Sequence, residues 1–393
     1  MDKNTPDRTD LEDAAIDDFE LRENAVSGSE NGVAEAEAEA GIAALVEAER
    51  EAEAEEAVVA EAALAAEVEE PAEEEPEPAP EPEPEPAPEP AAAKAKPAKK
   101  AKMPVRKLAV LGSPIGHSKS PALHRAAYRA LGLDWEYDTA DVTEETLADF
   151  LAGLGPEWRG LSLTMPLKQS VIPLLAEADH LAEQTGGANT VLLDDGVVRG
   201  FNTDVSGIVW ALEAAGLESA RFVHILGGGA TAGSALVAAA ELGAERVDIY
   251  VRSLERSVWL EPLAHELGLM VRIRPLSQAD RSLDIPDLVI STLPGGVRTD
   301  VLYTDSTRRR SLLFDVSYDP WPSLLASAWQ AVGGRVVSGL AMLAHQALLQ
   351  VRIFVSGDPL QPLDDEDAVL AAMLEAVGID ATGAPLAEKV AAE

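Results

Sequence analysis

The stretch His224-Ile225-Leu226-Gly227-Gly228-Gly229-Ala230-Thr231-Ala232 decides the fold of this 393-residue chain. Its apolar start predicts the end of a buried strand, its glycines predict a tight turn, and its small residues predict the start of a helix. In this G-x-G-x-x-A pattern, Gly227 permits the turn, Gly229 lets backbone amides approach a pyrophosphate, and Ala232 lets the helix pack closely on the strand. The surrounding strand and helix favour a dinucleotide-binding loop over a merely flexible turn.

The residues around this loop predict a doubly wound α/β sheet. We expect the helix after the loop to reach residue 242, and another helix over residues 207–215 to precede the unit. The predicted strands cover residues 221–226, 245–251, 288–292 and 313–316. A sheet of this kind binds a nucleotide at the carboxyl ends of its strands.

The tip of the second of these strands indicates which dinucleotide is bound. An NAD site usually has a carboxylate there, which holds the ribose hydroxyls. This chain instead has Arg252 and Ser253, with Arg256 one turn further on. An arginine can pair with a 2′-phosphate and stack on an adenine, and Ser253 can donate a hydrogen bond. The tip therefore favours NADP, the alternative being an ordinary exposed arginine.

Another α/β unit precedes the glycine loop. Its predicted strands cover residues 105–112, 135–141 and 160–165, and its predicted helices cover 121–131 and 146–153. Alternating strands and helices predict a mostly parallel sheet. After the second unit, we expect apolar helices over residues 339–355 and from about 364 to 377, followed by a frayed end.

The charge of the chain is concentrated at its N-terminus. Residues 1–102 hold 31 of the 69 acidic and 9 of the 31 basic side chains, a net of −22 out of −38. This part is rich in Ala, Glu and Pro and has no wide apolar face, so it is expected to be a disordered, solubilising tail. The alternative is an arm that binds a partner or tethers the rest of the chain.

Composition narrows the class of protein further. The acidic balance argues against a nucleic-acid surface, and the absence of cysteine excludes disulfides and thiolate zinc sites. The histidines form no spaced ligand set, so no metal is expected. No unbroken run of about 18 apolar residues and no signal peptide are visible, so we expect a cytoplasmic protein without a membrane span.

Polar residues near strand ends of the first unit suggest a ligand site. Between the first strand and helix, Ser118 and Ser120 offer hydroxyls beside a helix N-terminus, which suits a carboxylate. Simple capping by Ser120 would explain the same residues. Lys168, Asn189 and Asp204 each lie near a strand end and can converge on the ligand-binding edge of one sheet.

Six strings in order make the sequence recognisable. They are PIGHSKSP, TMPLK, GGANTV, FNTD, the glycine loop, and SGLAMLAHQALLQ. Along most of residues 104–380 the chain resembles the shikimate dehydrogenase family. The resemblance implies a reversible, NADPH-dependent reduction of 3-dehydroshikimate to shikimate in aromatic amino-acid biosynthesis, by a monomer or homodimer.

The resemblance also implies roles for individual residues. Lys168 and Asp204 would be the catalytic pair beside the hydroxyl that is oxidised. Residues implied to bind the substrate are Ser118 and Ser120 at its carboxylate, Thr164, Asn189 and Gln346 at its ring hydroxyls, and Tyr318 closing over it. Residues implied to bind NADP are Gly227, Gly228, Gly229, Ala230, Arg252, Ser253, Ser291, Thr292 and Gly339.

The residue patterns and the family resemblance together predict the domain organisation of the chain. It comprises a disordered tail over residues 1–102, a substrate-binding α/β sheet domain over 103–206 and a Rossmann NADP-binding domain over 207–338. C-terminal helices over 339–380 would return to the substrate domain, before a flexible end over 381–393.

Some positions depart from the family pattern and bear on substrate and cofactor preference. Ser162 replaces a usual asparagine, Val205 a glycine and Val251 an asparagine, and His345 is unusual beside Gln346. A quinate or quinate/shikimate dehydrogenase, with NADP or with NAD, stays open as an alternative, and so does a non-catalytic relative that binds ligand. A free lysine has a pKa near 10.4, so protonated Lys168 is suited to donate a proton in the reducing direction. To accept a proton in the oxidising direction, Lys168 would need burial, which lowers its pKa.

Overall fold

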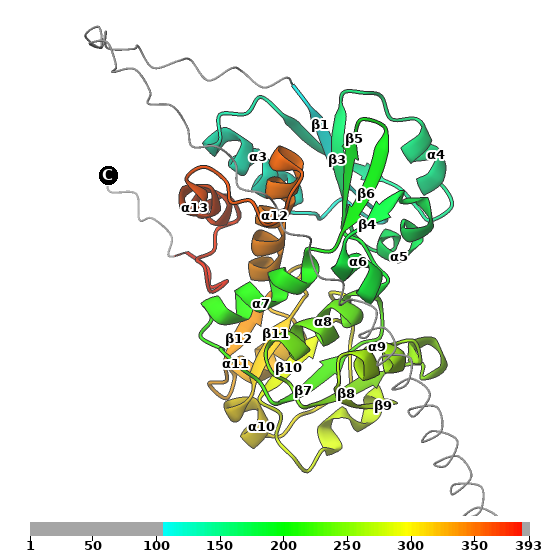
Figure 1. Cartoon of the computed structure of the whole chain (residues 1–393). Coiled ribbons are helices and arrows are strands. Elements are labelled where there is room, and N and C mark those ends of the chain that lie inside the picture. Colours follow the sequence, from blue (N-terminus) through cyan, green and yellow to red (C-terminus); the bar gives the residue numbers. More distant parts are fainter. Residues whose placement is uncertain (1–104, 387–393) are drawn as a thin grey trace, which may run out of the picture. The chain divides into compact units, whose positions relative to one another are not determined.

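A computed structural model describes residues 105–386 of the chain. These residues form two six-stranded sheets with helices packed against them (Figure 1). The expected disordered tail lies outside the described residues. So do residues 387–393 of the expected flexible end.

The first sheet has the strand order β2-β1-β3-β5-β6-β4. Its strands are β1 (Lys107–Gly112), β2 (Glu136–Asp141), β3 (Trp158–Leu163), β4 (Glu177–Ala178), β5 (Thr190–Asp194) and β6 (Val197–Phe201). Strand β5 runs antiparallel to both of its neighbours, β3 and β6, whereas the other pairs in the sheet are parallel. The expectation of a mostly parallel sheet is confirmed, with this one reversed strand added.

The faces of the first sheet are covered by different helices. Leu108 and Val110 pack toward α3 and toward two C-terminal helices, α12 (Gly339–Ser356) and α13 (Glu366–Val377). Ala109 and Leu111 pack toward α4, α5 and α6 on the other face. The N-terminal helices are α3 (Ser120–Ala130), α4 (Leu147–Ala152), α5 (Leu167–Ser170) and α6 (His180–Thr185), with a 3-10 turn at Ile172–Leu174.

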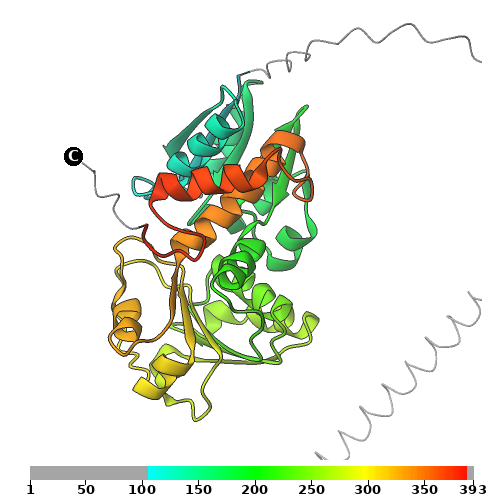
Figure 2. The ribbon, with the colours of Figure 1, turned by 90° about the vertical axis from the view of Figure 1, so that its left-hand side faces the viewer.

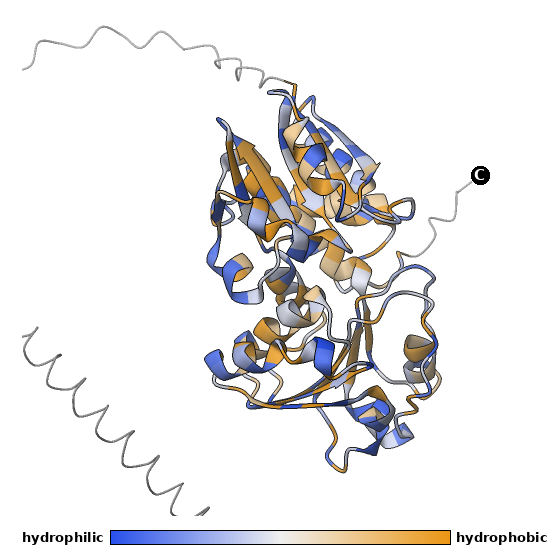
Figure 3. Cartoon of the chain, turned by 90° about the vertical axis from the view of Figure 1, so that its right-hand side faces the viewer, coloured by the Kyte–Doolittle hydropathy of each residue, from blue (hydrophilic) through white to orange (hydrophobic). Residues whose placement is uncertain are grey.

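The second sheet is entirely parallel and has the order β12-β11-β10-β7-β8-β9. Its strands are β7 (Phe222–Leu226), β8 (Arg246–Val251), β9 (Met270–Pro275), β10 (Leu288–Ser291), β11 (Leu312–Asp315) and β12 (Val336–Ser338). Its helices are α7 (Asp204–Ala214), α8 (Ala230–Glu241), α9 (Leu260–Glu266), α10 (Asp305–Arg310) and α11 (Leu324–Gln330), with 3-10 turns at Glu255–Ser257 and Leu276–Arg281. Hydrophobic residues concentrate on the central strands of the sheets (Figure 3).

Helix α12 (Gly339–Ser356) connects the second sheet to the first. It packs against α7, where an added Cβ at Gly207 would lie 2.8 Å from Gln346 Cβ, so the helices approach closely only because residue 207 is glycine. Helix α13 (Glu366–Val377) then packs against α3 and α12 (Figure 2). The long apolar helices expected after residue 338 are thus confirmed.

By length and composition, α12 is the one helix in the described residues that could cross a membrane, but 67% of it is buried within the fold. Its apolar character therefore has a simple explanation, because α12 forms part of a hydrophobic core.

The C-terminal end differs from expectation. Residues 381–386, which we expected to fray, form a turn in which Asp380 N donates to Ala384 O and Leu386 N donates to Gly378 O. An added Cβ at Gly383 would lie 2.9 Å from Ala341 Cβ, so the turn packs against α12.

Candidate active site

Two charged side chains form the centre of the candidate site. Lys168 Nζ donates to Asp204 Oδ2 at 2.5 Å, and the side chains are 15% and 1% exposed. Lys168 lies on α5, just after the carboxyl end of β3, and Asp204 is the first residue of α7, just after β6. A carboxylate in the first turn of a helix is favoured by the helix dipole.

The reversed strand β5 brings Asn189 to the same edge. Because β5 is antiparallel to β3 and β6, its first residues lie beside the carboxyl ends of those strands. Asn189 Oδ1 accepts a hydrogen bond from the backbone N–H of Thr203, which fixes the orientation of the amide. Asn189 Nδ2 can then donate to Asp204 Oδ1 at 2.8 Å and to Gln346 Oε1 at 2.5 Å.

A cavity of about 240 Å³ opens over the charged pair. Eight of the sequence-predicted residues line it, namely Ser118, Ser120, Thr164, Lys168, Asp204, Tyr318, Gly339 and Gln346. Asn189 does not line the cavity but lies behind Asp204 and Gln346, holding both. The structure therefore brings together side chains from α5, α7, α12 and several loops.

The loop before α3 forms one side of this cavity. The alternative in which Ser120 caps the helix is wrong, because α3 begins at Ser120 without a side-chain cap; instead, Ser118 Oγ accepts the N–H of Ser120 at 3.3 Å. Burial raises the pKa of Tyr137, and hydrogen bonds with Ser162 and Ser120 partly oppose this effect. The buried hydroxyl of Ser120 thus interacts inward with Tyr137 rather than with the start of the helix.

Other cavity-lining residues escaped sequence reasoning. They are Pro114, Ile115, His117, Thr231, Val316, Met342 and Leu343. Most of them lie inside the quoted strings, so position within a string was the available signal. His117 Nδ1 lies 3.6 Å from Asp319 Oδ2, which links the loop before α3 to the segment that carries Tyr318.

A buried polar network supports the back of the site. Gln350 Nε2 donates to Asn189 O at 3.1 Å, and Gln350 Oε1 accepts from Ser162 Oγ at 2.7 Å. His124 Nε2 lies 3.1 Å from Gln350 Oε1, and the His124 ring stacks on Tyr137 with centroids 4.0 Å apart. Ser162, a departure from the family pattern, is a buried member of this network and does not line the cavity.

The remaining departures from the family pattern are also buried. Val205 is fully buried in the core between α7 and the second sheet, and Val251 packs into the same core. His345 lies with its ring 6.3 Å from that of Trp210. Burial lowers the pKa of His345.

The glycine loop fits a dinucleotide. Gly227 has φ +118°, and an added Cβ there would lie 2.3 Å from Thr292 Oγ1. Both facts require glycine at this turn. Gly229 precedes the first turn of α8 and has open space around it, so the N-terminal amides of a long helix are accessible to an anion.

Other predicted cofactor residues lie along the carboxyl edge of the second sheet. Arg252 is exposed just after β8, and Ser253 Oγ accepts the N–H of Arg256 at 3.4 Å. Thr292 Oγ1 donates to Leu226 O at 3.0 Å, next to the glycine turn. Ser291 is buried and lines a second cavity, apart from the one over Lys168. At one end of this sheet edge, Arg252 therefore offers a positive charge for a phosphate. At the centre of the edge, the residues are small.

A parallel dinucleotide-binding sheet beside a separate sheet with a lysine–carboxylate pair defines a nicotinamide-dependent dehydrogenase. A family model described as the shikimate dehydrogenase substrate binding domain matches residues 110–191. A protein of Methanothermobacter thermautotrophicus named shikimate dehydrogenase (NADP(+)) is 34% identical over 270 residues, which span 66% of this chain and 94% of that protein. The protein of the same name from Methanothrix thermoacetophila is 36% identical over 273 residues, or 68% of this chain and 97% of that one.

Solved structures agree with these relatives. The crystal structure of Mycobacterium tuberculosis shikimate dehydrogenase is 36% identical, has a TM-score of 0.58 and covers 68% of this chain and 98% of that one. The Thermus thermophilus shikimate 5-dehydrogenase structure in complex with NADP(H) and shikimate is 30% identical, with a TM-score of 0.58 and coverage of 69% and 99%. This chain belongs to the shikimate dehydrogenase family.

Proposed function

We propose that this protein reversibly reduces 3-dehydroshikimate to shikimate with NADPH. The observation that carries the proposal is the Lys168–Asp204 pair at the floor of a cavity bounded by polar groups from both parts of the fold. Relatives that this chain matches over most of their length carry the name of this activity.

The substrate would be held by groups around that cavity. Ser118, which is half-buried, and Ser120 suit a carboxylate on the side of the α3 loop. Thr164 and Gln346 suit ring hydroxyls, and Tyr318, which also lines the cavity, would close over the substrate. Fixed positions for these groups align the reacting carbon, which is a large part of catalysis.

Lys168 and Asp204 would handle the proton. In the reducing direction, Lys168 Nζ donates a proton to the oxygen that becomes the new hydroxyl, and Asp204 keeps Nζ oriented toward that oxygen. In the oxidising direction the proton returns to Lys168 Nζ. Asn189 supports both steps because it holds the other oxygen of the Asp204 carboxylate.

NADP supplies or accepts the hydride when it is bound. In the proposal, the N–H groups around Gly229 and the first turn of α8 hold its pyrophosphate, and Arg252 with Ser253 holds the 2′-phosphate. Gly339, which lines the substrate cavity at the start of α12, would lie on the nicotinamide side. Ser291 and Thr292 stay predicted contacts on that side.

The test follows nicotinamide reduction with shikimate and with quinate, each with NADP and NAD, for the wild-type protein and Lys168→Ala. Rapid turnover with shikimate and NADP that collapses in the variant would support the proposal. Faster turnover with quinate or NAD would assign the alternative dehydrogenase. Ligand binding without turnover would indicate the non-catalytic relative.

The wider setting is part of the same proposal. We expect a cytoplasmic monomer or homodimer whose partners are small molecules, with no role for nucleic acid, membrane or metal. Light scattering of the purified full-length chain measures the oligomeric state. Activity before and after removal of residues 1–102 tests whether the acidic N-terminal part contributes to catalysis.

A further inference from the structure

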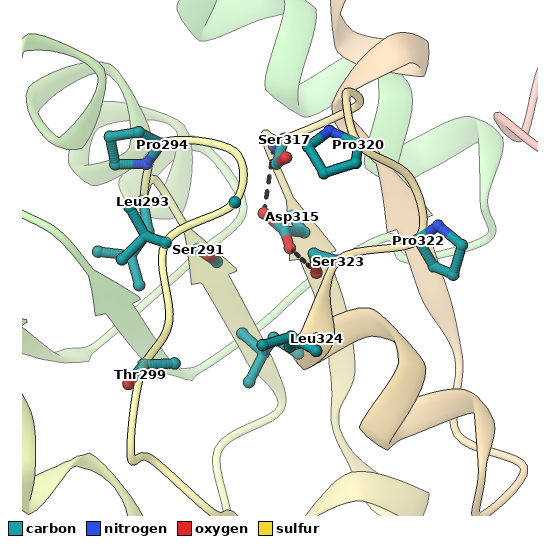
Figure 4. A pocket seen from close by; sticks show the side chains of 13 residues that line it. Ser291, Leu293, Pro294, Thr299, Asp315, Ser317, Pro320, Pro322, Ser323 and Leu324 are labelled. Atoms are coloured by element: carbon teal, nitrogen blue, oxygen red, sulfur yellow. Dashed lines mark hydrogen bonds between the residues drawn. The ribbon is translucent and has the colours of Figure 1, made fainter.

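A buried carboxylate lies at the end of β11, outside the substrate cavity. Asp315 is 2% exposed. It accepts a hydrogen bond from the backbone N–H of Ser317 at 3.2 Å and from the hydroxyl of Ser323 at 2.5 Å. Figure 4 shows the carboxylate between these two partners, beside a second cavity of about 150 Å³. Asp315 thus binds both ends of the segment 317–323.

The hydroxyl of Ser323 donates its proton to Asp315. Ser323 caps α11 by accepting the N–H of Ala326 at 3.0 Å, so its single proton is free to point at Asp315. By contrast, the hydroxyl of Ser317 is buried and has no hydrogen-bond partner within the described part of the chain. Ser317 therefore contacts Asp315 only through its backbone N–H.

Side chains alternate between two sides of the chain after β11. Asp315 and Ser317 face the second cavity, whereas Val316 and Tyr318 line the substrate cavity. This alternation is that of extended backbone. Since the contacts of Asp315 fix one side of the segment, they help to direct Tyr318 toward the other side, together with the hydrogen bond between Tyr318 and the backbone of Lys119.

The segment also has other anchors. Tyr318 forms a hydrogen bond with the backbone of Lys119, and Asp315 forms one with the side chain of Ser291. Val316 N donates to Ser291 O at 2.9 Å, and Gly339 N donates to Ser317 O at 3.4 Å. Beyond Tyr318, Asp319 is exposed and meets exposed His117 at 3.6 Å. A charge-assisted hydrogen bond to a buried carboxylate is stronger than a neutral one, so we expect the Asp315 contacts to add order to the segment beyond these anchors.

We propose that Asp315, through Ser323 and the Ser317 amide, is a positioning residue that holds Tyr318 toward the substrate. This inference rests on the proposed function, in which Tyr318 covers the bound substrate. Asp315 itself touches neither the substrate cavity nor the catalytic pair.

The test compares two serine-to-alanine changes on the same segment. Ser323→Ala should raise KM for shikimate about tenfold with kcat changed less than about threefold, because substrate binding and not proton transfer is weakened. Ser317→Ala should leave KM within about twofold, since it removes a hydroxyl that forms no hydrogen bond. Ser323→Thr keeps the hydroxyl and should restore KM.

A double-mutant cycle identifies the route of the effect. Asp315→Asn should act like Ser323→Ala in the wild-type background and change KM less than about twofold in Tyr318→Ala. Equal effects in both backgrounds would overturn the proposal, as would equal effects of Ser323→Ala and Ser317→Ala.

Hydrogen exchange provides a readout that does not need turnover. Residues 316–323 should exchange faster in Asp315→Asn and Ser323→Ala than in wild type, with Ser317→Ala unchanged. If the wild-type protein lacks activity, the proposed function fails, while unchanged exchange would refute the role of Asp315 separately.

Discussion

Lys168 Nζ and Asp204 Oδ2 lie 2.5 Å apart although the two residues are 36 positions apart in the chain. Asp204 is nearly inaccessible, whereas Lys168 reaches the cavity. A buried carboxylate that lost its cation would keep its desolvation penalty without compensation. The pair therefore contributes both to the stability of the site and to its chemistry, and variants can separate the contributions.

Asp204→Asn should abolish most turnover while the protein still folds. We expect kcat to fall at least about a hundredfold, since Lys168 loses the group that orients it. The free energy of unfolding should fall by about 2 kcal/mol, below the cost for a fully enclosed pair, because Lys168 opens to the cavity.

The matched control for Asp204→Asn is Asp248→Asn. Asp248 is also almost fully buried, but it pairs with Arg246 in the other sheet, at 3.2 Å. Both variants should lose stability in urea unfolding, and only Asp204→Asn should lose kcat. Comparable kcat losses in the two would contradict a specific role for Asp204.

Arg252→Ala should weaken NADP selectively. Loss of a charge-assisted contact to the 2′-phosphate should raise KM for NADP about 10- to 100-fold and leave KM for NAD nearly unchanged. Arg310→Ala, which removes another exposed arginine at the end of α10, serves as the control. Steady-state kinetics with both dinucleotides provide the measurement, and a parallel rise in both KM values would count against the assignment.

Gly227→Ala should cost both stability and cofactor binding. At φ +118° an alanine is strained, and its Cβ would meet Thr292 Oγ1. We expect a loss of about 2–3 kcal/mol in the free energy of unfolding. Gly229→Ala has no such conflict and should fold normally. Thermal unfolding of the two variants decides this, and equal midpoints would show that the turn tolerates a side chain.

Buried histidines should make stability depend on pH. Burial lowers the pKa of His124 to about 3 and that of His224 to about 4, and hydrogen bonding to Gln350 opposes the effect only in part at His124. The unfolded chain therefore takes up these protons first. The full stability is present above pH 6.5 and declines as pH falls below it, by about 1.4 kcal/mol per pH unit for each group.

The matched variants for this pH effect are His124→Gln and His265→Gln. Urea unfolding measures the free energy of unfolding at each pH. Between pH 6.5 and 5, its pH dependence should be smaller by about one proton in His124→Gln. His265→Gln, at an exposed position on α9, should not change it. An unchanged slope in His124→Gln would mean that His124 is protonated in the folded protein.

Much of the fold could be predicted because the signals are local. The strand, glycine turn and helix around Gly227 and every other predicted strand and helix were found within a few residues of the predicted bounds. Other elements were missed. Strands β4, with two residues, and β12, with three, are too short to show periodicity, but the longer strands β5, β6 and β9 and helices α9 and α11 were missed as well. The domain boundaries at residues 206 and 338 stay predictions.

The candidate site could be predicted only in part. The quoted strings contain the pair Lys168 and Asp204 and, except for Tyr318, the polar residues around the cavity. They did not single out Gln350, although it is the last residue of the final string; it lies one turn after Gln346 on α12 and supports Asn189 from behind. Nor did they single out Asp315, whose partners lie within eight residues of it but have no recognisable spacing.

The sequence by itself determined the order of the elements, the glycine turn and the chemical groups available for catalysis, because hydrophobic periodicity and turn preferences act over a few residues. Only the tertiary structure decided which of those groups meet. The reversal of β5 brings Asn189 to the edge where Lys168 and Asp204 lie, and the return of α12 places Gln346 beside them. Such contacts depend on strand direction and helix packing, which arise from interactions between residues far apart in the chain.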